Sequence, residues 1–105
     1  MDWINLNSIE QFDELLENQK VFAVFKHSTR CPVSSTAKNR VEKEWTHSFP
    51  IYYLDLLNHR AISNYIAEKT GVQHQSPQLI VLENKKVIYD ASHSFIFVND
   101  IQTSS

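Results

Sequence analysis

One stretch constrains the fold of this chain more than any other, because it joins a buried strand to a helix through a short turn. The run Val21–Phe25 is apolar without polar alternation, which is typical of a strand covered on both faces. Beyond the polar turn, apolar residues recur at every fourth position, at Val33, Ala37, Val41 and Trp45. This spacing predicts a helix that shows one apolar stripe to the sheet. The stretch therefore predicts a strand, a tight turn and a helix, as in α/β proteins.

The only cysteine of the chain, Cys31, lies where this helix begins. Pro32 fits the first helical position, because its missing N–H costs nothing there and its fixed φ suits the turn. Cys31 is then the N-cap residue, where the unpaired amides of the first turn and the positive end of the helix dipole favour thiolate over thiol. Arg30 adds a neighbouring positive charge. Most lone cysteines are small buried hydrophobes, but the features of this stretch together favour a reactive thiol.

The residues before this stretch predict a short strand and a first helix. Residues 3–6 fit a short edge strand. Ser8 and Gln11 form a candidate capping box. The apolar stripe that follows consists of Ile9, Phe12, Leu15 and Leu16. Asn18 is the expected end of this helix.

A second strand–helix unit follows the helix at residue 32. The run 51–57 predicts another buried strand, and the helix between the two strands makes them parallel through a right-handed crossover. Asn58 is the predicted cap of a third helix. Gly71 is the predicted left-handed residue that ends it.

The last third of the chain predicts a hairpin. Residues 79–82 and 87–89 are apolar and flank the polar turn 83–86. The tail from Ser92 fits either a short last helix or, at 95–98, a strand. A parallel unit followed by a hairpin predicts a mixed sheet covered by helices, and the length of 105 residues predicts one domain over residues 1–105.

Charge and composition narrow the classes of function. A net charge of -2 and a pI near 6.2 give no electrostatic footprint for nucleic acid or an anionic membrane. The apolar runs are too short to span a bilayer, and the N-terminus lacks the pattern of a signal peptide. A single cysteine excludes an intramolecular disulfide and fits a reducing cytosol, so we expect a cytoplasmic protein. With one glycine there is no glycine-rich loop for a nucleotide.

The histidines provide one candidate for the site and no metal centre. His27 lies close to the turn and is a candidate to tune Cys31 or to shuttle its proton, although a packed or solvated role is commoner at a strand end. The other four, His47, His59, His74 and His93, lack the spacing that brings two ligands onto one helix face. We therefore expect no structural metal.

The residues around Cys31 resemble a known family of redox proteins. The turn 31–34, Cys-Pro-Val-Ser, resembles the active-site turn of the thioredoxin superfamily in its monothiol form. The longer block 25–34, Phe-Lys-His-Ser-Thr-Arg-Cys-Pro-Val-Ser, resembles more narrowly the monothiol bacilliredoxins of bacteria that use bacillithiol. The resemblance extends from residue 3 to about residue 91. It implies a thioredoxin-like fold, with a central mixed sheet of four to five strands and helices on both faces.

This resemblance assigns roles to the residues of the turn. Cys31 becomes the catalytic residue, and serine at position 34 stands where a dithiol member carries the second cysteine. Thiol-binding or activating roles fall to His27, Thr29, Arg30, Pro32 and Ser34. Thr29 and the amides after Pro32 are expected to hold the leaving thiolate or the carboxylate of the small thiol.

The resemblance also predicts a substrate groove at Ser76 and Pro77. Thioredoxin-like folds carry a cis proline opposite the active cysteine, although only about 5 to 6% of X-Pro bonds in folded proteins are cis. We therefore expect a cis Ser76–Pro77 bond, with the backbone of Ser76 pairing with an incoming peptide or thiol as an added strand. Gln75 and Gln78 would line the same groove.

The activity that the resemblance implies is thiol-disulfide exchange. The Cys31 thiolate would attack the small thiol in a mixed disulfide on a client protein, release the client cysteine and carry the small thiol itself. The resemblance names that thiol as bacillithiol, which is a co-substrate and not a bound cofactor. The expected partners are bacillithiolated client proteins, and the expected state is a monomer.

Two other functions stay open on the sequence. One is a non-catalytic thioredoxin-like binding or stress-response module, whose Cys31 is only thiolated under oxidation. The other is an iron–sulfur carrier that bridges two chains through Cys31, as some monothiol glutaredoxins do. Against the second, Pro32 and Val33 stand where those proteins carry a glycine and an aromatic residue.

Overall fold

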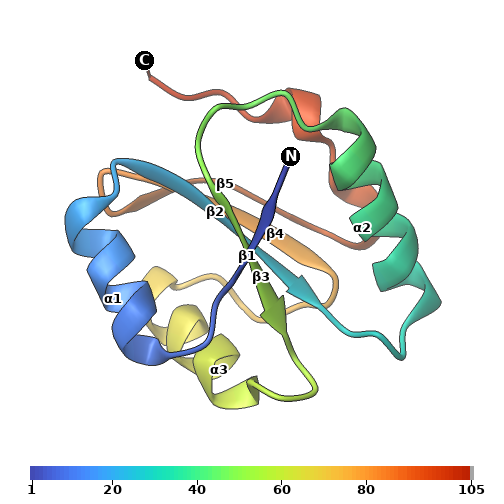
Figure 1. Cartoon of the computed structure of the whole chain (residues 1–105), viewed down its shortest axis with the longest axis horizontal. Helices are drawn as coiled ribbons and strands as arrows, with labels where there is room; N and C mark the ends of the chain where they lie inside the picture. Colours follow the sequence, from blue (N-terminus) through green and yellow to red (C-terminus); the bar gives the residue numbers. More distant parts are fainter. Residues whose placement is uncertain (105) are drawn as a thin grey trace.

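The computed structural model describes residues 1–104, which form a mixed sheet with helices on both of its faces (Figure 1). The strands are β1 (Trp3–Asn5), β2 (Val21–His27), β3 (Ile51–Asp55), β4 (Gln78–Glu83) and β5 (Lys86–Ser92). The helices are α1 (Ile9–Asn18), α2 (Pro32–Glu44) and α3 (Arg60–Thr70). The expected α/β class is confirmed, and the sheet of the described residues has five strands.

Strand β2 lies at the centre of this sheet. The strand order is β1-β3-β2-β4-β5. The three strands β1, β3 and β2 run parallel, whereas β4 is antiparallel to β2 and β5 is antiparallel to β4. All residues of β2 and β4 are buried, while β5 at the edge alternates between exposed and half-buried positions. The apolar run that begins β2 is therefore covered on both faces, as the sequence predicts.

The two faces of the sheet carry separate apolar cores. Helices α1 and α3 cover one face, and α2 with the C-terminal segment covers the other (Figure 1). Val24 points into the first core and Phe25 into the second. The alternation continues to the end of β2, where Lys26 contacts α3 and His27 contacts α2. The last two residues of this strand thus place polar groups on opposite faces, directly before the turn that holds the cysteine.

Three helix ends that the sequence predicted correctly depend on residues close to those ends. The Ser8 hydroxyl caps α1 by accepting a hydrogen bond from the Gln11 backbone N–H at 3.0 Å. The Gln11 side chain accepts from the N–H of Asn7 at 2.8 Å, one residue before the partner that a capping box uses. Helix α1 ends at Asn18, and Gly71 ends α3 with a φ of 74°, in the left-handed region that glycine tolerates.

The strand predicted for residues 51–57 is shorter in the structure and ends at Asp55. The Asp55 carboxylate accepts hydrogen bonds from the Leu57 N–H at 3.0 Å and from the Asn58 side-chain amide at 2.7 Å. These bonds close a turn, and Leu57 is 49% exposed. The cap of α3 is consequently His59, so the prediction of Asn58 as the cap was wrong by one residue.

The buried stripe of α2 also differs from the sequence prediction at its first residue. Val33 does not face the sheet and is 48% exposed, whereas Ser34 beside it is fully buried. An α-helix has 3.6 residues per turn, so a repeat of four drifts around the helix, while spacings of three and seven keep one face. Ser34, Ala37 and Val41 follow the second pattern and form the buried stripe.

The hairpin and the tail complete the second core. The predicted hairpin is confirmed, with a turn of Asn84 and Lys85 that both have positive φ, at 51° and 70°. The tail forms two 3-10 turns, His93–Phe95 and Val98–Asp100, in place of the single short helix or the strand at 95–98 that the sequence allowed. It buries three aliphatic side chains, Ile96, Val98 and Ile101.

Candidate active site

Cys31 occupies the N-cap of α2, at the carboxyl end of β2. Its backbone N–H donates to the Ser28 carbonyl at 3.1 Å, and its own carbonyl accepts from the Ser35 N–H at 3.2 Å. Pro32 follows as the first helical residue, as predicted, and Cys31 is a partly exposed free cysteine. The turn therefore presents one sulfur at the positive end of a helix, where an approaching disulfide can reach it.

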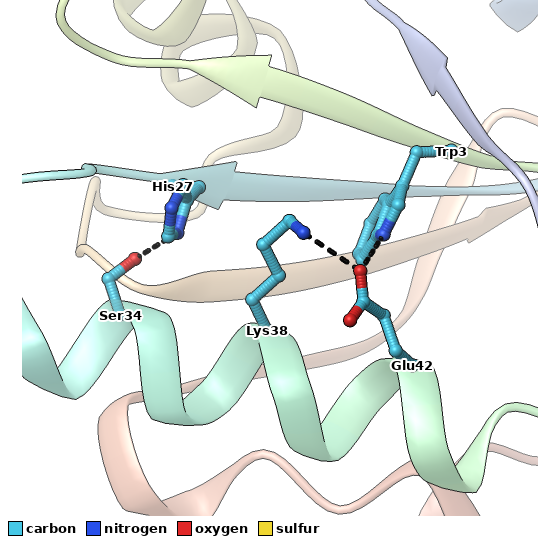
Figure 2. A network of polar contacts seen from close by, with 5 residues as sticks. All are labelled: Trp3, His27, Ser34, Lys38 and Glu42. Atoms are coloured by element: carbon cyan, nitrogen blue, oxygen red, sulfur yellow. Dashed lines mark hydrogen bonds and ion pairs between the residues drawn. The ribbon is translucent and has the colours of Figure 1, made fainter.

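Ser34 and His27 form a buried polar pair behind this turn (Figure 2). The Ser34 Oγ lies 2.6 Å from the His27 Nδ1 and accepts from the Ser28 N–H at 3.1 Å. Burial, and then the Lys38 charge, lower the pKa of His27, whereas Asp55 opposes this shift. We therefore assign a neutral imidazole whose Nδ1 accepts a hydrogen bond from the Ser34 hydroxyl and whose Nε2 carries the ring proton. The pair ties the end of β2 to the first turn of α2.

A second polar group on α2 lies over the edge strand. The Glu42 carboxylate accepts from the Trp3 indole at 2.6 Å and pairs with Lys38 at 2.8 Å (Figure 2). The Lys38 ammonium lies 5.4 Å from the centre of the Trp3 ring and 5.9 Å from that of Tyr53. These contacts lower the pKa of Glu42, chiefly through the hydrogen bond from Lys38. They anchor α2 to β1, so the helix that carries Cys31 is held at both ends.

The other predicted residues of the turn, Thr29 and Arg30, are both exposed beside Cys31. The structure thus brings Thr29, Arg30 and the cysteine together at the surface, and it places His27 and Ser34 beneath them. The thiol-binding and activating roles of these residues stay predictions.

The loop before β4 lies next to the end of β2. The Ser76–Pro77 bond is cis, as predicted, and the Pro77 carbonyl accepts from the His93 N–H at 2.9 Å. Gln78 pairs in register with Lys26, which places the start of β4 beside the residues that lead to the cysteine. Within residues 1–104, the buried Ser76 Oγ and Gln78 Oε1 have no hydrogen-bond partner. The groove expected at Ser76 and Pro77 stays a prediction.

A basic cluster near this loop was missed by the sequence analysis. The Lys26 ammonium is buried 3.4 Å from the Ser63 carbonyl and 3.5 Å from the His74 Nδ1. Arg60 reaches the other ring nitrogen of His74 at 3.1 Å. The signal for Lys26 was present, since it is a charged residue at the end of an apolar strand that predicts burial. No local pattern indicated its partners, because they lie 34 or more positions away.

Among residues 1–104, no three side chains of the types His, Cys, Asp and Glu gather closely enough to hold a metal ion. No helix in the same range has the length and apolar character needed to cross a bilayer.

Comparisons with known proteins find a matching family and solved structures with a similar fold. A family model described as monothiol bacilliredoxin BrxC matches residues 4–101. A solved structure described as a putative oxidoreductase with a thioredoxin fold is 37% identical, with a TM-score of 0.84, and the match covers 92% of this chain and 88% of that chain.

Two thioredoxins extend the comparison at lower identity. That of Malassezia sympodialis is 14% identical with a TM-score of 0.73, over 94% of this chain and 84% of its own. That of Schistosoma mansoni is 20% identical with a TM-score of 0.67, over 89% and 84%. These two show the thioredoxin-like fold alone.

Proposed function

Because the chain belongs to the monothiol bacilliredoxin family, we propose that it removes bacillithiol from mixed disulfides on client proteins through Cys31. The family and the thioredoxin-fold oxidoreductase give the chain a thiol redox role. The observation that carries the proposal is the position of Cys31, which is the only cysteine and is a partly exposed N-cap residue of α2.

The proposed reaction is a thiol-disulfide exchange at one sulfur. The Cys31 thiolate attacks the bacillithiol sulfur of the client adduct, so a Cys31–bacillithiol bond forms as the client–bacillithiol bond breaks. The client cysteine leaves as a thiolate and takes a proton from solvent. A second bacillithiol molecule then attacks the adduct, which frees Cys31 and gives bacillithiol disulfide. One disulfide is present before and after each step, so no outside oxidant is needed.

The residues around the turn support this cycle in different ways. Position 34 is serine, so it supplies no thiol to resolve the adduct. Its hydroxyl is buried and hydrogen-bonded to His27 and to the Ser28 N–H. The second thiol must therefore come from solution. Thr29, Arg30 and the amides that follow Pro32 line the exposed side, where they can hold the leaving thiolate.

We expect Cys31→Ser to abolish the exchange and to leave the fold intact, because the sulfur is the nucleophile and the side chain is partly exposed. The measurement is the intact mass of protein and client after mixing the reduced protein with a bacillithiolated client. The wild type should gain the mass of bacillithiol as the client loses it. Ser35→Ala, a change at an exposed neighbour, is the matched control and should react like the wild type.

Two results would count against the proposal. If Cys31→Ser still removes bacillithiol, the thiol of Cys31 is not the nucleophile. If the wild type leaves the client modified and its own cysteine free, the chain does not act on this adduct. The non-catalytic module would then explain the fold better.

A further inference from the structure

The basic cluster under the loop 71–77 joins three segments of the chain. Lys26 comes from the end of β2, Arg60 is the first residue of α3, and His74 belongs to the loop. His74 lies between the two cations, with Nδ1 3.5 Å from the Lys26 ammonium and Nε2 3.1 Å from the Arg60 guanidinium. Ser63 adds a hydroxyl 2.8 Å from the same Nδ1.

The cluster has more hydrogen-bond donors than acceptors. A neutral imidazole has one acceptor nitrogen, and a charged one has none. If Nε2 accepts from Arg60, then Nδ1 carries the proton and offers nothing to Lys26. If Nδ1 is the acceptor, Arg60 loses its partner instead. One of the two cations therefore always lacks an acceptor at His74.

The cluster also lacks a negative charge. Within residues 1–104, neither ion pair includes Lys26 or Arg60. The first turn of α3 contains no acidic residue, and the side chain of its cap His59 makes no hydrogen bond to the amides of that turn. Burial, and then Arg60, lower the pKa of Lys26 to about 8. Burial, Lys26 and Arg60 likewise lower the pKa of His74. Part of both pKa shifts comes from neighbouring positive charges, whose repulsion a bound anion would offset.

The cluster lies at the same end of the sheet as the cysteine turn. The His27 carbonyl accepts from the Leu56 N–H at 3.0 Å, so the turn into α3 adjoins the end of β2. Lys26 pairs with Gln78, two residues after the unsatisfied Ser76 hydroxyl. In Figure 1, helix α3 lies in the lower half of the view, together with the segments that follow β2 and β3. Ligands of open sheets bind at this carboxyl edge of parallel strands.

We propose that Lys26, Arg60 and His74 form a subsite for the carboxylate of the small thiol that Cys31 exchanges. The inference rests on the proposed function and adds to it the group by which the thiol is recognised. The exposed Arg60 guanidinium and the half-buried His74 ring contact the carboxylate, helped by the amides of the first turn of α3. Lys26 is buried beneath these two side chains, and it attracts the carboxylate through a charge that water screens poorly.

Binding of a carboxylate would resolve the competition at His74. Arg60 can turn to the carboxylate, which frees Nε2 to carry the ring proton and to donate it to the second carboxylate oxygen. Nδ1 then becomes the acceptor for Lys26 or for Ser63. Arg60 and the ring N–H of His74 both gain a charged acceptor, so the bound anion is worth more here than on an ordinary basic surface.

The experiment compares two adducts of one client protein that has a single cysteine. One adduct carries bacillithiol and the other carries 2-mercaptoethanol, which is uncharged. Excess reduced protein removes each adduct in a single turnover, and intact mass follows the client. Arg60→Gln should slow removal of bacillithiol by about tenfold, the loss expected for one charge-assisted hydrogen bond. Lys26→Met should slow it by a similar factor, because it removes a poorly screened positive charge from beneath the carboxylate. Removal of 2-mercaptoethanol should change by less than about twofold, because that thiol has no carboxylate.

The matched control is Lys69→Met, which removes an exposed lysine from the other end of α3 and should leave both rates unchanged. Arg60→Gln changes an exposed side chain, so it tests the inference independently of any change in the core around Lys26. Circular dichroism verifies the fold of each variant.

The other outcomes separate the inference from the proposed function. If both variants remove bacillithiol as fast as the wild type, the subsite is wrong and the proposed function stands. If both adducts slow equally, the cluster contacts a carboxylate of the client, and the inference is again wrong. If the wild type removes 2-mercaptoethanol but not bacillithiol, the proposed function fails and the inference with it.

Discussion

Lys26 shows how a single buried charge can affect the whole protein. Its side chain is fully buried, and its pKa falls from 10.5 to about 8, mainly because burial removes water from the ammonium. One pKa unit corresponds to about 1.4 kcal/mol, so the charged lysine costs the fold about 3 kcal/mol at neutral pH. That is a large part of the roughly 5 to 15 kcal/mol that stabilises a domain. A residue with this cost fits a functional role better than a structural one.

We expect Lys26→Met to stabilise the protein at pH 7, by up to about 3 kcal/mol. Because the lysine pKa is lower in the folded state than in the unfolded state, the wild type regains this stability as the pH rises from about 8 to above 10.5. The difference between the two proteins should therefore shrink over that range. Urea unfolding at several pH values measures it, and a difference that stays constant or grows above pH 8 would show that folding does not lower the pKa of Lys26.

The same variant provides a second measurement at His74. The Lys26 charge is one of the causes that lower the pKa of His74, after burial itself. The pKa of His74 should consequently rise in Lys26→Met, which a histidine titration by nuclear magnetic resonance detects. A titration unchanged from the wild type would mean that the two side chains do not interact.

Among the elements, α2 depends on a contact in its first turn. Ser34 joins this turn to β2 by accepting from the Ser28 N–H and by bonding to the His27 ring. Ser34→Ala leaves these groups without their partner, so we expect a loss of about 1 to 3 kcal/mol in the free energy of unfolding. Urea unfolding measures the loss. Ser35→Ala, at the exposed neighbour, should stay within about 0.5 kcal/mol of the wild type. Equal midpoints for the two variants would mean that the buried pair adds no stability.

Elements whose ends depend on local chemistry could be predicted from the sequence. The Ser8 cap, the cap position of Cys31 and the left-handed Gly71 all follow from residues within one turn of the helix end. The cis bond before Pro77 was predicted from the family resemblance alone. The end of β3 was not predicted, because apolar residues continue past the turn that Asp55 closes.

The parts of the site that depend on distant segments could not be predicted from the sequence. The exposure of Val33 follows from the helical repeat once the buried face is known, but four-residue spacing suggested the opposite. The cluster at Lys26 unites positions 26, 60, 63 and 74, which no local pattern connects. Sequence reasoning thus located the cysteine and its turn, whereas the fold was needed to find the charges that lie near it.

In the whole molecule, the C-terminal tail completes the core on the α2 face of the sheet. Ile96 is 1% exposed within that core, whereas its neighbour Phe95 is 72% exposed. Ile96→Ala should lower the free energy of unfolding by about 2 to 5 kcal/mol, because it leaves a cavity. Phe95→Ala removes a larger side chain from the surface and should cost less than about 1 kcal/mol. Thermal unfolding of the two variants measures the contrast, and similar melting temperatures would mean that the tail is not part of the core.

The single cysteine limits the disulfide-bonded forms that the protein can take. Since the sequence contains no second cysteine, any disulfide that Cys31 forms joins the chain to another molecule. The disulfide-bonded form is therefore always a conjugate with another molecule, and its mass identifies that molecule. A sample taken from a mixture at one moment would contain the bare thiol and the small-thiol conjugate in proportion to their lifetimes. The intact mass of the protein would thus show which of the two steps of its cycle is the slower.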